Sequence, residues 1–422
     1  MPVKTAPPSP AACLGPAAIV RMAYEGRDVR PLLADLIPRA QLGLADPAAL
    51  FDLATLLQSH GGELAAEGLL MLTAAARQNC DFRVTHGTGR GLRVLAFVTP
   101  GDFMANTPID FLLQGSDAVL ILHFVDAGTT TLANLPAHDV AFMAVAESAA
   151  NATVLARMAR LLADWPGPIF NNAAGFIAAM TRDRVSALLA VEPALLAPPT
   201  FRVSRAALQA IAAGSGHWSG VGADLTPPLL LRPVGSHAGQ SLARIADLTD
   251  LRNWLRQTPD AEAYATPFID YRRLDGLFAK ARVVMIKGRP FAGHLALSDH
   301  WMVHYLNAAM AENPKRRAEE AAWMRGFDRR PGPDRRAGFA WRNRQALAAL
   351  QRIIGLDYFA VDCAEMPDGR LLIFEVDVAM IVHDMDSAAV FPYKKAAMRR
   401  LFGAFLAALT RASRESGAAT GA

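Results

Sequence analysis

Cysteine is scarce in this chain, and its spacing excludes two classes of protein. The 422 residues contain only three cysteines, Cys13, Cys80 and Cys363, which lie far apart and form no Cys-x-x-Cys pair. A disulfide scaffold or a cysteine-built zinc site would need closely spaced pairs, so both are excluded. This low cysteine content fits a reducing compartment, and we expect a cytoplasmic protein.

Long apolar runs are also missing. No stretch approaches the roughly 18 apolar residues that would suggest a membrane span. The first twenty residues carry Lys4 and several prolines in place of a continuous apolar segment, so we expect neither a signal peptide nor a membrane partner. A chain of this length, with 52% hydrophobic residues, should form two or three domains that each bury a core.

Lysine is the third scarcity. Of the 43 basic residues only six are lysines and 37 are arginines, with no lysine between Lys4 and Lys280. The formal net charge is only +4, and the basic residues are not gathered into one stripe. Because nucleic-acid binders concentrate positive charge, we expect no nucleic-acid partner.

The chain divides into a helical, an α/β and an α+β part. After a loose tail at 1–18, the three- and four-residue spacing of apolar residues predicts a helical hairpin within 1–88, broken at Gly61-Gly62. One degenerate helical repeat is the alternative. The segment 89–197 alternates strands with helices, which predicts a parallel sheet covered on both faces. The strands are expected at 92–98, 118–125, 140–145 and 169–170, and the helices at 108–113, 149–162 and 182–189.

Beyond Pro198-Pro199 the pattern changes to antiparallel pairs, which predicts an α+β domain over 198–412 and a tail at 413–422. Strands are expected at 229–231 and in a hairpin of 278–287 with 290–297 around Gly288-Arg289, and helices at 305–328, 341–354 and 392–410.

The segment 357–377 is the most informative part of the sequence. Two β-prone runs flank Asp368-Gly369, a strong hairpin signal, and centring the turn there places Asp362 opposite Glu375 with Asp377 on the same face. Opposed carboxylates repel, so we expect a cation between them, and oxygen ligands of this kind suit Mg²⁺. A solvated acidic face and a shifted register are the alternatives.

A second segment, 229–242, is a strand that runs into a loop with Gly235, Ser236 and Gly239. Glycines let backbone N–H groups approach phosphate oxygens, the serine adds a donor, and Arg232 at the strand end supplies positive charge. The loop lacks the Gly-Lys-Ser/Thr of a Walker A motif. Alone, it predicts no more than a candidate phosphate loop.

Together these two segments resemble the ATP-grasp superfamily. That family has a strand with a cationic residue and proline before a Gly/Ser-rich loop, and later an Asp followed by a Glu-x-Asn that bind two Mg²⁺. Here Val361-Asp362 and Glu375-Val-Asp377 match this pattern, with Asp377 in place of the usual Asn. More narrowly, the runs 299–305 and 355–362 are similar to a glutathione-synthase-like or RimK-like subgroup, some members of which carry helical repeats in front.

The resemblance covers about residues 89–410 and implies the ATP-grasp fold, in which two α+β subdomains clasp ATP. The segment 205–265 would be the lid subdomain, and 89–197 the α/β domain that precedes ATP-grasp in this superfamily. The implied mechanism is phosphorylation of a substrate carboxylate by ATP and attack of an amine on the acyl phosphate. The implied cofactors are ATP and Mg²⁺, with two ions expected.

The resemblance also implies roles for individual residues. The expected metal ligands are Asp362, Glu375 and Asp377. The expected ATP contacts are Arg232, a second arginine at Arg182 or Arg184, the loop residues Gly235, Ser236, His237 and Gly239, and Phe268 and Ile269 at the adenine.

One family cation, two residues before the first metal Asp, is replaced here by Ala360. Lys280, Arg282 or Arg342 is therefore expected to join Arg232 in stabilising the acyl phosphate. Lys280 and Arg282 lie two apart on one strand, and a solvated strand face is their alternative.

Three histidines, His294, His300 and His304, are expected to contact the substrate. His300 and His304 are one helical turn apart, but the general-base Glu of a zinc-protease helix is missing between them. Ordinary packing is the alternative to substrate contact.

The leading hypothesis is an ATP- and Mg²⁺-dependent ligase that joins a small-molecule or peptide carboxylate to an amine, forming an amide or peptide bond. A kinase-like phosphotransferase and a catalytically impaired nucleotide-binding interaction protein are the alternatives. Relatives in the family are often dimers or tetramers, which leaves a homodimer open.

Overall fold

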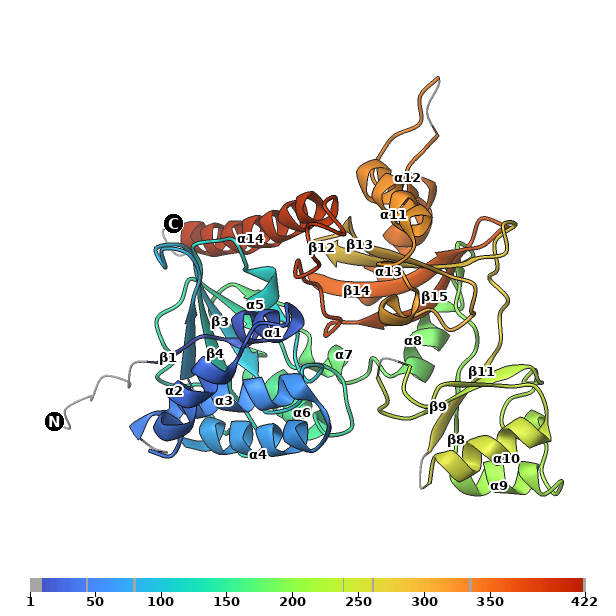
Figure 1. Cartoon of the computed structure of the whole chain (residues 1–422), viewed down its shortest axis with the longest axis horizontal. Helices are drawn as coiled ribbons and strands as arrows, with labels where there is room; N and C mark the ends of the chain where they lie inside the picture. The colour runs from blue at the N-terminus through green and yellow to red at the C-terminus, as the bar shows by residue number, and fades with distance from the viewer. Residues whose placement is uncertain are drawn as a thin grey trace. The chain divides into compact units, whose positions relative to one another are not determined.

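The computed structural model describes residues 10–42, 45–78, 81–237, 239–259, 262–333 and 336–419. The chain forms two compact units, and Figure 1 labels many of their helices and strands. The first takes in the chain up to Ala178, the short segment Leu356–Ala360 and the chain from Asp377 onward. The second consists of Ala179–Gly355 and Val361–Val376. The mixed α/β architecture agrees with the prediction from sequence.

The first unit is built on a six-stranded sheet in the order β1-β2-β4-β3-β5-β6. All neighbours are parallel except β2 with β4. The central strands are buried along nearly their whole length, as expected for parallel strands covered on both faces. The four strands predicted within 89–197 are confirmed as β3 to β6. The strands are β1 (Ala11–Cys13), β2 (Asp81–Thr85), β3 (Arg93–Val98), β4 (Val119–Phe124), β5 (Val140–Met143) and β6 (Ile169–Phe170).

Helices surround this sheet. The predicted helical hairpin is confirmed: α3 and α4 pack together, and α3 ends at Gly61, whose positive φ of 73° suits glycine. The helices are α1 (Pro16–Tyr24), α2 (Arg30–Ala40), α3 (Pro47–His60), α4 (Gly62–Gln78), α5 (Ile109–Leu112), α6 (Ala152–Leu161) and α7 (Ala174–Ile177).

The loose tail predicted for 1–18 is wrong from residue 11 onward. β1 pairs with β2, and α1 begins at Pro16. The N–H groups of Leu14 and Gly15 donate to the two carboxylate oxygens of Asp52, at 2.8 and 3.3 Å, which fixes the connection between β1 and α1. Residues 1–9 and Cys80 lie outside the described residues. Because β1 and β2 belong to the same sheet as β3 to β6, the segments 1–88 and 89–197 share this sheet.

Asp52 should make the stability of the protein depend on pH. Burial raises its pKa to about 6, against the opposing effect of the hydrogen bonds from Leu14 and Gly15. The folded chain therefore keeps this proton at pH values where the unfolded chain, with an Asp pKa of about 3.9, has lost it. The free energy of unfolding should fall by up to about 3 kcal/mol between about pH 4 and pH 6.

Urea unfolding of wild type and Asp52→Asn at pH 4.5 and pH 7 checks this expectation. The variant cannot ionise at this position, so the wild type should lose more stability than the variant over this range. Equal losses in the two proteins would contradict it.

Helix α14 (Lys394–Ala419) completes the first unit and confirms the predicted C-terminal helix. Its predicted apolar stripe, Leu401, Phe405 and Leu409, is fully buried. The ring of Phe405 lies 5.9 Å from that of Phe142 on β5, so the stripe packs on the six-stranded sheet. This stripe therefore belongs to the core of the first unit.

The second unit contains a four-stranded antiparallel sheet in the order β10-β9-β11-β8. It packs with two helices around one apolar core that includes Leu208, Leu231 and Trp254. This sheet spans the range in which the lid subdomain is predicted. Its elements are β8 (Phe201–Val203), α9 (Arg205–Ala212), β9 (Leu229–Pro233), β10 (Ala243–Ile245), α10 (Leu248–Gln257) and β11 (Ala263–Pro267).

A five-stranded sheet follows in the order β13-β12-β14-β15-β7. Both predicted hairpins, β12 with β13 and β14 with β15, are confirmed. The strands are β7 (Leu195–Leu196), β12 (Phe278–Ile286), β13 (Arg289–Ser298), β14 (Tyr358–Glu365) and β15 (Leu371–Asp377), and the helices are α8 (Arg182–Leu189), α11 (Pro314–Gly326), α12 (Phe339–Arg342) and α13 (Arg344–Ile354).

The turns of both hairpins differ from prediction by one residue. The first turn is Lys287-Gly288, where both φ values are positive as a type I′ turn requires, because Ile286 pairs with Arg289. At the second turn the N–H of Met366 donates to the carbonyl of Arg370 at 2.9 Å, whereas the predicted register places Met366 opposite residue 371. Gly369, with a φ of 86°, accommodates the extra turn residue.

The helix predicted for 305–328 begins only at Pro314. Asn313 caps it by accepting the N–H groups of Lys315 and Arg316, and Pro314 has no N–H to leave unpaired at the first helical position. The predicted helix at 341–354 is confirmed by α12 and α13 and ends at the left-handed Gly355. Among the helices described, none has both the length and the apolar character needed to cross a membrane.

Candidate functional site

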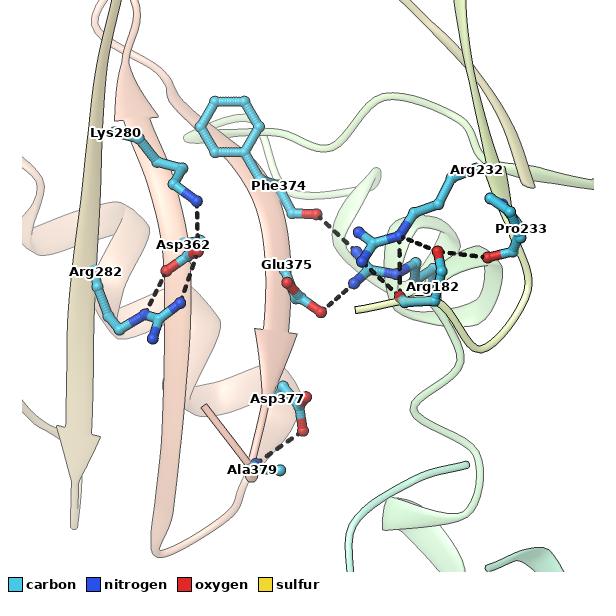
Figure 2. Close-up of polar contacts among 11 residues, drawn as sticks. Arg182, Arg232, Pro233, Lys280, Arg282, Asp362, Phe374, Glu375, Asp377 and Ala379 are labelled. Carbon is cyan, nitrogen blue, oxygen red and sulfur yellow. Dashed lines mark hydrogen bonds and ion pairs between the residues drawn. The ribbon is translucent and has the colours of Figure 1, made fainter. Parts of the chain in front are cut away.

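Asp362 is the centre of a buried charge cluster in the second unit (Figure 2). It lies on β14, and Lys280 and Arg282 reach it from the neighbouring strand β12. Lys280 Nζ donates to Asp362 Oδ2 at 3.0 Å, and Arg282 donates from Nε to Oδ1 at 2.8 Å and from Nη2 to Oδ2 at 3.0 Å. The two cations are only 15% and 19% exposed, so they do not form a solvated strand face.

The carboxylate of Asp362 stays ionised in this setting. Burial acts to raise its pKa, but the charges of Arg282 and Lys280 outweigh burial and hold the pKa well below its ordinary value. Two cations therefore contact this one carboxylate.

A second cluster surrounds Glu375 on β15. Arg182, the first residue of α8, donates from Nη2 to Glu375 Oε1 and from Nη1 to the carbonyl oxygen of Phe374 at 3.5 Å. Burial acts to raise the pKa of Glu375, but the charges of Arg182 and Arg232 lower it overall. Burial, and then the charge of Arg182, lowers the pKa of Arg232 to about 10. Here again one carboxylate stands among two cations.

Arg232 also organises the predicted phosphate loop. From the end of β9 it donates through Nε to Ser236 Oγ at 3.1 Å and through Nη2 to the Ser236 carbonyl at 2.6 Å. Gly235 and Gly239 have φ values of 78° and 76°, which glycine adopts without strain. His237 lies in the same loop. The predicted association of a cation with a glycine-rich loop is therefore present, while its contact with phosphate stays a prediction.

The three carboxylates predicted to share metal ions do not form one cluster. Within the ranges that the structure describes, no group of three or more His, Cys, Asp or Glu side chains is arranged to hold a metal ion. Asp362 and Glu375 are bonded to cations, and Asp377 accepts the N–H of Ala379 at 2.9 Å. The role of these three residues as metal ligands stays a prediction.

Two other predicted cations have different surroundings. Arg342 makes a bidentate ion pair with Glu365, at 2.9 and 2.7 Å, and is 46% exposed. Arg184 is exposed on α8. Residues two apart on a helix point in different directions, so only one of Arg182 and Arg184 can face Glu375, and that residue is Arg182.

The predicted histidines divide into two kinds. His294 lies opposite Arg282 in the register of the β12–β13 hairpin. Burial, together with the charges of Lys280 and Arg282, lowers the pKa of His304. Both histidines are therefore close to the cluster around Asp362. His300 is exposed, and its Nδ1 accepts the N–H of Met302 at 3.2 Å. Substrate contact by all three stays a prediction.

The predicted adenine contact, Phe268, has two neighbours that sequence reasoning missed. The guanidinium of Arg244 lies 4.7 Å from the centroid of the Phe268 ring, and the ring of Trp301 lies 5.8 Å away. Ile269 follows and is partly exposed. Arg244 lies in the short segment that follows the glycine loop in the sequence. This segment forms β10, which pairs with β9 and brings Arg244 opposite Leu230.

The sequence matches no family model and no curated protein. Among solved structures, it is similar to a RimK-domain ATP-grasp protein from Sphaerobacter thermophilus, with a TM-score of 0.40 and 15% identity over 75% of this chain and 99% of that one. A D-alanine–D-alanine ligase from Bacillus anthracis complexed with ATP has a TM-score of 0.44 and 12% identity, over 77% and 98%. The VanG D-Ala:D-Ser ligase from Enterococcus faecalis has 0.45 and 11%, over 76% and 100%.

Proposed function

We propose that this chain is an ATP- and Mg²⁺-dependent ligase of the ATP-grasp type, which joins a carboxylate to an amine. The observation that carries the proposal is the pair of charge clusters, in which Asp362 and Glu375 each stand among two cations. Four cations gathered around two carboxylates offer fixed positive charge to an anionic ligand. A triphosphate is a ligand of the right charge.

The residues around the second cluster support the same ligand. Arg232 and Arg182 hold the α- and β-phosphates beneath the loop of Gly235 and Ser236, whose backbone is suited to close approach of phosphate oxygens. Arginine offers planar, bidentate contacts to phosphate. Phe268 lies where the resemblance places the adenine.

The chemistry of the donor set suits Mg²⁺ at the end of β15. Glu375 and Asp377 are two residues apart on one strand and therefore share a face, and both provide the hard oxygens that Mg²⁺ prefers. Arg182 donates one hydrogen bond to Glu375, at Oε1. When bound, the ion neutralises phosphate charge and favours transfer of the terminal phosphoryl group.

The proposed reaction has two steps. A carboxylate oxygen of the acid attacks the γ-phosphorus, the bond from that phosphorus to the bridging oxygen breaks, and ADP leaves with the electron pair. The amine then attacks the acyl carbon, the carbon–oxygen bond to phosphate breaks, and inorganic phosphate leaves as the amine loses a proton. Lys280 and Arg282 stabilise negative charge on the transferred group.

ADP release in pooled carboxylic acids and amines tests this proposal, with Asp362→Ala and Glu375→Ala as the inactive comparisons. The expected result is ADP formation that needs an acid and an amine together and is lost in both variants. ADP formed with the acid alone and no amide product would indicate a phosphotransferase. Nucleotide binding with no ADP in any pool would contradict catalysis.

Arg232→Lys tests whether the arginine itself matters. Lysine keeps the charge but loses the fork that bonds Ser236 at two atoms. We expect ATP affinity, measured by calorimetry, to fall by about tenfold. Arg184→Lys makes the same change at an exposed position and should leave the affinity unchanged. An unchanged affinity in Arg232→Lys would show that the arginine bias of this chain is only compositional.

A further inference from the structure

Asp362 differs from Glu375 in the number of hydrogen bonds that its carboxylate oxygens accept from cations. Both oxygens of Asp362 accept hydrogen bonds from cations, Oδ1 from Arg282 and Oδ2 from both Lys280 and Arg282. Its side chain is 4% exposed, whereas that of Glu375 is 24% exposed. Mg²⁺ binds its oxygen ligands at about 2.0–2.1 Å and must be close to an available lone pair. Three of the roughly four lone-pair sites of the Asp362 carboxylate already accept hydrogen bonds from cations, and the remaining site on Oδ1 belongs to a side chain that is almost fully buried.

Charge opposes a metal ion at this position as well. Lys280 and Arg282 lie within hydrogen-bond distance of Asp362, so a divalent cation bound there would lie close to two positive charges. Breaking the ion pairs to admit the metal would leave two cations without their partner at sites that are mostly buried. Leaving buried charges unpaired is strongly unfavourable.

We propose that Asp362 is a positioning residue and not a metal ligand: it holds Lys280 and Arg282 side by side as the cations that serve the transferred phosphoryl group. This proposal rests on the proposed function. One N–H of Lys280 is used by Asp362, and an ammonium group has two more to offer a ligand. Lys280 and Arg282, which lie on β12, also supply positive charge in place of the family cation that Ala360 replaces.

The two roles predict different losses. Replacing a metal ligand weakens metal binding whether ADP or AMP-PNP is bound. A residue that positions Lys280 and Arg282 affects the γ-phosphate, so its loss reduces the preference for AMP-PNP, which has this group, over ADP, which lacks it. Because Asp362 acts through Arg282, replacing both residues should reduce this preference no more than replacing either one alone.

Asp362→Asn and Glu375→Gln, both nearly isosteric, compare the two carboxylates directly. With MnCl₂ titrated against protein and ADP and followed by electron paramagnetic resonance, we expect Asp362→Asn to bind Mn²⁺ within about twofold of wild type, and Glu375→Gln at least about tenfold more weakly. Calorimetry should show the AMP-PNP preference falling about tenfold in Asp362→Asn, Arg282→Gln and their double variant alike. Arg352→Gln, which breaks the exposed ion pair of Arg352 with Glu192, should change neither quantity.

A loss of Mn²⁺ affinity in Asp362→Asn as large as that in Glu375→Gln would overturn the proposal. If Asp362→Asn fails to fold, the triple variant Asp362→Leu, Lys280→Met, Arg282→Met replaces the whole cluster without leaving an unpaired charge. Retained Mn²⁺ affinity in that variant supports the proposal, and a tenfold loss contradicts it. A wild type that binds neither nucleotide would refute the proposed function instead, which keeps the two failures distinct.

Discussion

Replacing Glu375 with glutamine should lower ATP-dependent ADP release by about 100-fold or more, because fixed charges aimed at the reacting phosphates are usually a large part of catalysis. Glutamine keeps the shape of the side chain but removes the charge that holds Arg182 and, in the proposed function, binds the metal. Steady-state ADP release in the acid and amine pools that are active with wild type measures the effect.

The control for this prediction is the same substitution at Glu365, whose carboxylate pairs with the half-exposed Arg342. Glu365→Gln should retain activity within about twofold, because an exposed ion pair contributes little. Circular dichroism of both variants shows whether the fold is kept. Full activity in a folded Glu375→Gln protein would remove Glu375 from the proposed site.

Arg282→Ala should lower the free energy of unfolding by about 3–5 kcal/mol, because the buried carboxylate of Asp362 loses two hydrogen bonds from a charged donor, each of which contributes about 1.5–3 kcal/mol. Asp362 would keep only Lys280 and lose the two hydrogen bonds from Arg282, at 2.8 and 3.0 Å. Urea unfolding followed by tryptophan fluorescence measures the loss.

The loss should also depend on pH with a defined sign. The pKa of Asp362 is depressed in the folded protein, so its contribution to stability is present above the unfolded Asp pKa of about 3.9 and is lost as pH falls below it. The difference between wild type and Arg282→Ala should therefore be nearly constant from neutral pH down to about pH 4 and shrink only as the pH falls below that value. Arg342→Ala is the control, and should cost about 1 kcal/mol or less at either pH. Equal losses in the two variants would show that the cluster around Asp362 contributes no more than a surface ion pair.

Features decided by neighbouring residues could be predicted from the sequence. The hairpin around Asp368-Gly369, the helix end at Gly355 and the apolar stripe of α14 are all present. In each case the deciding residues lie within a few positions of one another, so composition and spacing are sufficient.

Pairings between distant segments could not be predicted in the same way. Lys280 and Asp362 are 82 positions apart, and nothing local in either strand indicates that β12 and β14 are neighbours. The cations at Asp362 were therefore predicted as phosphate or substrate contacts, while their ion pairs with the carboxylate were missed. Whether Arg182 or Arg184 faces Glu375 likewise depends on how α8 is rotated against β15.

Short elements and exact registers were the remaining errors. β1 has three residues, too few for an alternating pattern, and the residues that follow it donate hydrogen bonds to Asp52, on a helix 38 positions away. The register at the β14–β15 turn depends on whether Gly369 adds a residue to the loop, and the dipeptide Asp-Gly is compatible with both loop lengths.

The scarcity of lysine has a chemical consequence for the proposed reaction. An acyl phosphate acylates unprotonated amines, including those of the enzyme that makes it. Three of the four cations in the two clusters are arginines, whose guanidinium groups are poor nucleophiles because they stay protonated. The fourth, Lys280, directs its ammonium group to Asp362. The lining of this site is therefore resistant to acylation by its own intermediate, and the activated acyl group is preserved for the incoming amine.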